Sequence, residues 1–296
     1  MPTINRRKFL QSGALGVAAV AAATIKPTTE LLADPLGLPI GLQTYTIGEA
    51  CNADLPGALK RVREIGYKDI ELGTFNYYGR KPRELRELVA DAGLGSISAS
   101  FGIQALREDW AKHIDDTHEL GVPYMICASL GAEDRNSLDA IHRSGALFNK
   151  AAEQCRKAGL RFAYHCHNFD FATVEGVVAY DELLRSTDPK YVDMEMDCFW
   201  TTIAGRDPVE YFDRHPGRFP LLHIKDLKRG FGPTTGHVEG GNPFAEVGSG
   251  VIDWKRIFAA APRGGLKHYA VEQDRCDRPP FESIKMSYDY LHQLTV

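Results

Sequence analysis

Two kinds of segment alternate along the chain from residue 40 onward. Short apolar runs rich in Val, Ile and aromatic residues have the length and composition of buried strands. Between them lie longer segments with apolar residues at helical spacing, such as Leu59, Val62 and Ile65. The runs that we predict to be strands are residues 40–45, 69–72, 96–101, 124–127, 161–165, 191–197, 220–225 and 268–272.

Capping residues mark the ends of the predicted helices. Asp54 is a suitable N-cap for a helix with Pro56 in its first turn. Glycines stand where a helix should end just before a strand, at Gly66, Gly93, Gly121 and Gly159. Further helices are expected over about 107–119, 137–158, 176–186, 207–214, 253–261 and 281–294.

Strict alternation of strands and helices predicts a parallel sheet with helical crossovers. Eight such units in about 260 residues predict a closed barrel, so we expect a single (β/α)8 TIM barrel over residues 35–296. The alternative, an open doubly wound sheet, is favoured by G-x-G-x-x-G after the first strand, and residues 41–45 lack that motif. The Gly- and Pro-rich stretch 230–250 is predicted to be a long loop at the active-site end.

The first 30 residues have the pattern of an export signal. Arg6, Arg7 and Lys8 precede residues 13–24, which are almost wholly Ala, Val, Leu and Gly. A basic segment followed by a short apolar segment is typical of a secretory signal, and the paired arginines indicate the twin-arginine route. About a dozen apolar residues are too few to span the ~30 Å hydrocarbon core of a membrane. We predict a periplasmic or secreted protein, free of the membrane once this segment is removed.

Composition and charge narrow the functional class. Hydrophobic residues make up 44% of the chain and charged residues 25%, proportions typical of a soluble globular protein. The formal net charge is −4, and without the first 26 residues, which hold four basic residues and no acidic one, it is −8. A protein this acidic repels a phosphate backbone. Nucleic-acid binding is therefore not expected.

Four consecutive predicted strands end in imidazoles or carboxylates, at the end where barrel enzymes hold their active sites. These residues are His165 and His167, Asp197, His223, and Glu272. Their nitrogen and oxygen atoms suit Mn²⁺, Zn²⁺, Co²⁺ or Fe²⁺, and burying such groups without a cation is costly. One such residue alone is usually structural, but four on neighbouring strands predict a site for one divalent metal ion.

Four short motifs carry a resemblance to a known family. They are YHCHNFDF at 164–171, HIKD at 223–226, GSGVIDW at 248–254 and VEQD at 271–274. In this order and spacing they resemble the xylose-isomerase-like sugar phosphate isomerase/epimerase superfamily, which includes ketose 3-epimerases and inosose dehydratases. The likeness runs from about residue 40 to the C-terminus. It implies a TIM barrel that acts on a small carbohydrate.

The resemblance also implies which residues hold the metal. The ketose 3-epimerase ligands fall on Asp197, His223 and Glu272, and the fourth ligand, a glutamate in that family, falls on His165. His167, two residues further on, is a competing ligand or a substrate contact. Mn²⁺ is the expected ion, with Mg²⁺, Co²⁺, Zn²⁺ and Fe²⁺ as alternatives.

Substrate contacts follow from the same comparison. A substrate-binding arginine of the epimerases falls on Arg229, and Trp200 stands where they have a substrate-contacting histidine. Glu71, at the end of the second predicted strand, is expected to bind a sugar hydroxyl. Since the chain carries an export signal and lacks a phosphate-binding loop, we expect a neutral sugar, a keto-sugar or a 3-keto-glycoside as substrate.

The reaction implied by the resemblance is proton transfer through a metal-stabilised enediolate. Glu272 corresponds to one of the two glutamates that exchange the proton in the epimerases, and His165 stands in place of the other; Lys225 and His167 are further candidate acids. We predict a carbohydrate isomerase or epimerase. The alternatives are β-elimination by a 3-keto-glycoside lyase or hydratase, and non-catalytic sugar binding. Homo-oligomerisation is left open.

Overall fold

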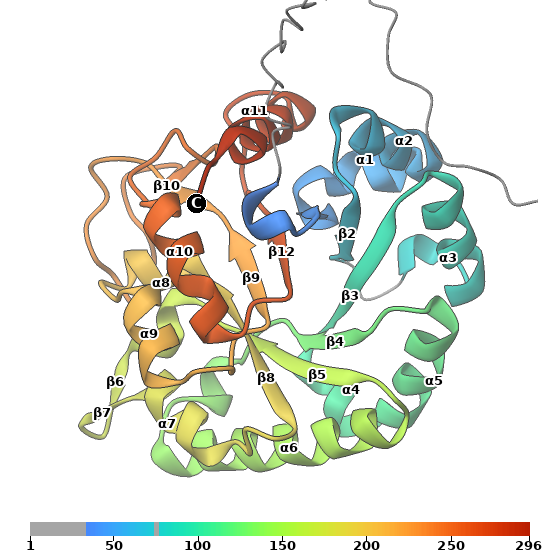
Figure 1. The fold of residues 1–296 in the computed structure, drawn as a ribbon. Helices are drawn as coiled ribbons and strands as arrows, with labels where there is room; N and C mark the ends of the chain where they lie inside the picture. Colours follow the sequence, from blue (N-terminus) through green and yellow to red (C-terminus); the bar gives the residue numbers. More distant parts are fainter. Residues whose placement is uncertain (1–33, 74–76) are drawn as a thin grey trace, which may run out of the picture. The chain divides into compact units, whose positions relative to one another are not determined.

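Each of the eight predicted apolar runs forms a strand in the computed structural model, which describes residues 34–73 and 77–296. The strands pair in parallel and close into a barrel in the order β1-β12-β9-β8-β5-β4-β3-β2 (Figure 1). Their bounds are β1 Ile40–Gln43, β2 Asp69–Leu72, β3 Gly95–Phe101, β4 Tyr124–Cys127, β5 Arg161–His165, β8 Val192–Asp197, β9 Leu221–Ile224 and β12 His268–Val271. The predicted single TIM barrel is confirmed.

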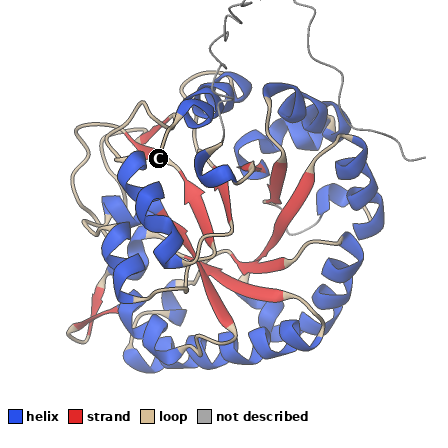
Figure 2. Cartoon of the chain, viewed as in Figure 1, coloured by secondary structure: helices blue, strands red, loops and turns tan. Residues whose placement is uncertain are grey.

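Helices surround the barrel (Figure 2). They are α1 Gly48–Ala53, α2 Leu55–Ile65, α3 Pro82–Asp91, α4 Ile103–Glu108, α5 Trp110–Leu120, α6 Leu138–Lys157, α7 Ala179–Ser186, α8 Cys198–Ile203, α9 Pro208–Arg214, α10 Trp254–Gly264 and α11 Pro280–Gln293. Asp54 caps α2 as predicted, accepting a hydrogen bond from the backbone N–H of Gly57 at 3.1 Å. Of the glycines expected to end helices, Gly121 adopts a φ of +80°, which the backbone needs there to leave α5 for the next strand.

Short elements in the connections complete the chain. The 3-10 helices are η1 Pro35–Gly37, η2 Thr44–Ile47, η3 Tyr77–Gly79, η4 Ala132–Asp134 and η5 Asn168–Phe171. Two small antiparallel ribbons pair β6 Thr173–Val174 with β7 Val177–Val178, and β10 Asp226–Leu227 with β11 Phe244–Ala245. The second ribbon joins the two ends of residues 228–243, so the long loop predicted over 230–250 is interrupted by β11.

The barrel interior is apolar at one end and polar at the other. A separate buried cluster consists of Ile97, Tyr124, Ile126, Ala163 and Leu221. On β5 and β9 the next residues with the same side-chain direction are His165 and His223, because alternate residues of a strand share a face. The apolar cluster therefore fills the barrel beneath the polar strand ends.

Three predicted boundaries are wrong. The first strand stops at Gln43 rather than at 45, because the Gln43 side chain accepts a hydrogen bond from the N–H of Tyr45 and starts η2. The helix expected at 107–119 is two helices, α4 and α5, separated at Asp109, whose φ and ψ of −126° and 35° are not helical. The helix expected from 176 begins at Ala179, since the preceding residues form the β6–β7 ribbon.

The predicted export signal, residues 1–30, lies outside the described residues and stays a prediction. Within 34–73 and 77–296, none of the helices combines the length and the apolar character needed to cross a bilayer.

Candidate metal centre

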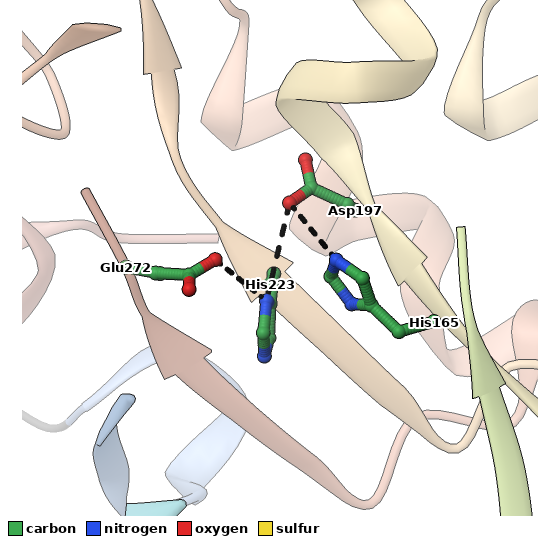
Figure 3. Close-up of side chains that lie close together, drawn as sticks. All are labelled: His165, Asp197, His223 and Glu272. Atoms are coloured by element: carbon green, nitrogen blue, oxygen red, sulfur yellow. Dashed lines mark hydrogen bonds and ion pairs between the residues drawn. The ribbon is translucent and has the colours of Figure 1, made fainter. Parts of the chain in front are cut away.

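Four adjacent strands deliver the predicted ligands to one end of the barrel. His165 ends β5, Asp197 ends β8, His223 lies in β9 and Glu272 directly follows β12. Asp197 and His223 are partners in the register of β8 and β9. All four side chains are buried, and they converge on one another (Figure 3).

The geometry of this cluster fits a single divalent cation. One nitrogen or oxygen atom of each residue lies within 4.8 Å of the corresponding atoms of the others. Asp197 Oδ2 is 3.8 Å from His165 Nε2 and 3.9 Å from His223 Nδ1. Glu272 Oε2 is 3.0 Å from His223 Nδ1. Ligand atoms at about 2.0–2.2 Å from one ion lie up to about 4.4 Å apart, so a small contraction brings all four to a common centre.

The two carboxylate oxygens of Asp197 have different roles, and Oδ2 is the one that faces the candidate ligands His165 and His223. Asp197 Oδ1 accepts a hydrogen bond from the N–H of Trp200 at 2.8 Å, which caps α8. Asp197 Oδ2 is buried and makes an ion pair with Lys225 Nζ at 3.1 Å. A carboxylate oxygen has two lone pairs, so Oδ2 can contact Lys225 and still bind a cation at this point.

A deeper layer of two glutamates orients the two histidines. Glu195, two residues before Asp197 on β8, places Oε2 2.9 Å from His165 Nδ1 and 3.4 Å from His223 Nε2. Glu71 of β2 places Oε1 3.0 Å from His223 Nε2 and accepts a hydrogen bond from Gln43 Nε2 at 2.5 Å. Each imidazole thus contacts a carboxylate through one nitrogen and faces the cluster with the other. This arrangement is common around metal-ligating histidines.

The two histidines differ in charge. Burial, reinforced by the neighbouring His223, lowers the pKa of His165 well below its usual range, so this imidazole is neutral. Burial alone would also lower the pKa of His223, but the carboxylates of Glu195, Glu71 and Glu272 outweigh it and raise that pKa well above its usual value. His165 Nε2 therefore offers a lone pair, whereas His223 must lose a proton when it binds a cation.

Lys225, a predicted acid, lies inside the same site. Its buried ammonium is 2.7 Å from Glu272 Oε2, 2.7 Å from Asp274 Oδ2 and 3.1 Å from Asp197 Oδ2. Burial disfavours the charge, but these three carboxylates outweigh it and raise the pKa of Lys225 well above its usual range. The side chain is therefore an ammonium ion, and it contacts two oxygens that also face the candidate metal position.

Asp226, the last residue of the HIKD motif, has a structural role. Its Oδ2 accepts hydrogen bonds from the N–H of Gly248 at 2.9 Å, the N–H of Gly250 at 3.2 Å and Nε1 of Trp254 at 2.9 Å. A Cβ at Gly250 would lie 2.2 Å from Asp226 Oδ1, so only glycine fits there. The GSGVIDW motif is thus wrapped around the carboxylate that follows the metal-facing strand β9.

The other predicted site residues lie at different places. The His167 ring stacks on Phe169 at 5.0 Å and lies 4.8 Å from the ring of His165, and burial lowers its pKa to about 3. Trp200 is half-buried, with its ring centre 5.6 Å from that of His167. Glu71 lines the site but contacts His223, as described above. Arg229 is exposed and lines a separate hollow within residues 229–240, so the structure does not bring it to the cluster.

A cavity of about 270 Å³ opens over the cluster, and we call it the mouth cavity. It is lined by the candidate ligands His165, His223 and Glu272 together with Glu71, Glu195, Lys225 and Asp274. Asp274 is a residue of this site that was not predicted. It follows Glu272 by two residues, and that spacing at a strand end was the signal that could have found it.

Comparison with known proteins places the chain among enzymes of one fold. A sequence profile described as xylose isomerase-like TIM barrel matches residues 59–292. The inosose dehydratase of Geobacillus kaustophilus (strain HTA426) is 25% identical over an alignment of 296 positions, which covers 82% of this chain and 91% of that protein. A crystal structure of a sugar phosphate isomerase/epimerase from Parabacteroides distasonis is 27% identical with a TM-score of 0.73, covering 85% of this chain and 96% of that one.

A more distant structure shows the fold alone. The IOLI protein, whose crystal structure holds a zinc atom, is 16% identical with a TM-score of 0.67 and covers 85% of this chain and 96% of its own.

Proposed function

The chain belongs to the xylose isomerase-like TIM barrel family, and we propose on that basis that it is a divalent-metal-dependent isomerase or epimerase of a carbohydrate. The single observation that carries the proposal is the convergence of four buried ligand atoms from four neighbouring strands within 4.8 Å. A protein of the same fold holds a zinc atom, which supports metal binding by this barrel. Manganese remains our first choice of ion.

His165, Asp197, His223 and Glu272 are the residues that would hold the ion. When bound, a divalent cation polarises a carbonyl oxygen and makes the neighbouring C–H more acidic. Glu195 and Glu71 keep the ligand nitrogens of the two histidines facing the centre, through the contacts of 2.9 and 3.0 Å.

The groups that could transfer protons line the mouth cavity. The pKa of Glu272 is held well below its usual value, since Lys225 and His223 outweigh the effect of burial, so its side chain is a carboxylate, the form that a base must have before it takes a proton. The Lys225 ammonium, 2.7 Å from Glu272 Oε2, is positioned to return a proton to a substrate oxygen. His165 cannot easily serve as the opposite base if it binds the metal. His167, neutral because of burial, is a further group at the edge of the cavity.

The site then has one base, Glu272, and no second base opposite it within the part of the chain that the structure describes. This favours a second candidate reaction, β-elimination from a 3-keto-glycoside or a related keto-sugar. One carboxylate base next to one ammonium acid is suited to remove a proton from carbon and protonate a departing oxygen. The likeness to an inosose dehydratase supports this alternative. Isomerisation and elimination share the first proton abstraction, so the same ligands serve both.

Incubation of Mn²⁺-loaded protein with keto-sugars, inososes and 3-keto-glycosides in deuterated water distinguishes the candidates. Deuterium gained at carbon without loss of a substituent supports the isomerase or epimerase. Release of the substituent with an unsaturated product supports elimination. Glu272→Gln should abolish either reaction, whereas Asp193→Asn, at the opposite end of β8, should not. If no substrate of the panel exchanges or eliminates, non-catalytic sugar binding is favoured.

We also propose export through the twin-arginine route. The adjacent Arg6 and Arg7 before the apolar residues 13–24 support it. Replacing both arginines by lysine should retain the protein in the cytoplasm, as measured by cell fractionation. Unchanged export of that variant would contradict the proposal.

A further inference from the structure

Beside the mouth cavity lies a second hollow of about 650 Å³. We call it the aromatic basin and define it by Phe169, Trp200, Phe244, Arg135 and Arg275, with His167 at the border that it shares with the mouth cavity. The mouth cavity, at about 270 Å³, is smaller than the ~300–1,000 Å³ typical of ligand pockets. A substrate with a substituent can therefore extend from one hollow into the other.

Charge distinguishes the two hollows. Four carboxylates line the mouth cavity: Glu71, Glu195, Glu272 and Asp274. Among the described residues that line the basin there is no Asp or Glu, while two arginines are present. In a chain with more acidic than basic residues this is a local reversal of sign. The two arginines of the basin, with no acidic residue beside them in its described lining, attract an anionic group.

The walls of the basin suit a flat, apolar group. Trp200 and Phe244 meet edge to face, with ring centres 5.7 Å apart and planes at 84°. His167 and Phe169 lie parallel, with planes at 4° and centres at 5.0 Å. Aromatic faces held at fixed angles bind planar groups by stacking and edge contacts.

Three buried nitrogen atoms of basin residues lack hydrogen-bond partners among the described residues. They are Arg135 Nε, His167 Nδ1 and Trp200 Nε1. The Arg135 guanidinium carbon lies 4.0 Å from the centre of the Phe169 ring, which holds this side chain over the aromatic wall. Arg135 Nε and Trp200 Nε1 are donors, and buried donors without acceptors are unfavourable, so a ligand oxygen reached by a small side-chain shift would satisfy them.

From these observations we propose that the aromatic basin is a substrate subsite for a planar, unsaturated substituent that carries a carboxylate. Arg135 and Arg275 would bind the carboxylate, and Phe169, Trp200 and Phe244 would hold the ring. The inference rests on the proposed function in one respect, since it takes the substituent to be attached to a carbohydrate bound at the mouth cavity. The substrate class is then a carbohydrate conjugated to an aromatic acid.

Benzoate is the probe that tests the subsite, with benzyl alcohol lacking the charge and acetate lacking the ring. Titration calorimetry and saturation-transfer NMR should show benzoate binding at least tenfold more tightly than either. Replacing both Arg135 and Arg275 by alanine should weaken benzoate at least fivefold and leave benzyl alcohol unchanged. Trp200→Leu should weaken both aromatic probes. The matched control is Arg143→Ala, an exposed arginine of α6 outside the basin, which should change nothing.

Three results would overturn the proposal. Benzoate that binds no more tightly than acetate would remove the aromatic contribution. An unchanged benzoate affinity in the double arginine variant would remove the carboxylate contact. Loss of binding on Arg229→Ala instead would assign the anion to the neighbouring hollow.

The test of this subsite is independent of the test of the proposed reaction. Benzoate binding requires neither a cation nor turnover, and it should persist in Glu272→Gln. Benzoate binding without any metal-dependent exchange would uphold the basin and refute the reaction. Metal-dependent exchange without benzoate binding would do the reverse.

Discussion

Glu195 lies beneath both histidines of the candidate metal centre, and its replacement by leucine is expected to weaken divalent-metal binding ten- to a hundredfold. Its Oε2 is 2.9 Å from His165 Nδ1 and 3.4 Å from His223 Nε2. Leucine has a similar volume and makes neither contact. Without the carboxylate, the His165 imidazole is no longer fixed in the orientation that turns its other nitrogen to the cluster.

The expected loss of metal affinity follows from the role of the Glu195 carboxylate in orienting His165. Removing a carboxylate that orients a metal-ligating histidine typically costs ten- to a hundredfold in affinity, which corresponds to about 1.4–2.8 kcal/mol. Glu71 still contacts His223 Nε2 at 3.0 Å, so the loss should come mainly through His165. Glu195→Gln retains an acceptor oxygen and the side-chain shape, and its metal affinity should stay close to that of the wild type.

Titration calorimetry with Mn²⁺ and with Zn²⁺ measures these affinities directly. Asp193→Asn is the matched control, because Asp193 lies two residues earlier on β8 and contacts Arg161 at 2.7 Å, away from the cluster. The reasoning is refuted if Glu195→Leu binds metal as tightly as the wild type, or if Asp193→Asn weakens binding equally.

Three further predictions concern other buried charges. Lys225→Met should tighten Mn²⁺ binding at least tenfold in calorimetry, because the ammonium shares oxygens of Asp197 and Glu272 with the ion. The same variant should lose turnover. An unchanged Mn²⁺ affinity would contradict this prediction. Asp226→Ala should lower the free energy of unfolding by about 2–4 kcal/mol in urea titrations, since the donors of residues 248–254 lose their acceptor; a loss under about 1 kcal/mol would contradict it. Burial raises the pKa of Asp170 from 3.8 to about 7, so this carboxyl stabilises the fold most at low pH, and its contribution to the free energy of unfolding is lost as the pH rises from about 4 to about 7. Asp170→Asn should flatten that part of the pH profile in urea titrations, and an identical profile in both proteins would refute the assignment.

The sequence predicted the barrel well because its signals are local. Every strand is a short apolar run, and the capping residue Asp54 has its effect within its own helix. Predictions of where strands and helices end were wrong where a side-chain hydrogen bond changes the direction of the backbone. At Gln43 a polar side chain caps η2, and that contact has no hydrophobic pattern to reveal it.

In the candidate site, the sequence predicted which face of each strand the side chains share. It did not predict which residue on that face lies level with the cluster. His165 and His167 follow each other by two residues, so sequence alone allows either to face the cluster. The structure brings His165 to it and stacks His167 on Phe169. Arg229 sits in a long loop whose path no local pattern determines, and it lines a different hollow from the one expected.

The central claim is that His165, Asp197, His223 and Glu272 bind one divalent cation together. Anomalous diffraction from crystals grown with Mn²⁺, recorded on both sides of the manganese edge, tests it most directly. The account predicts a single anomalous peak within bonding distance of all four side chains. No peak at this position, or one elsewhere on the barrel, would contradict it.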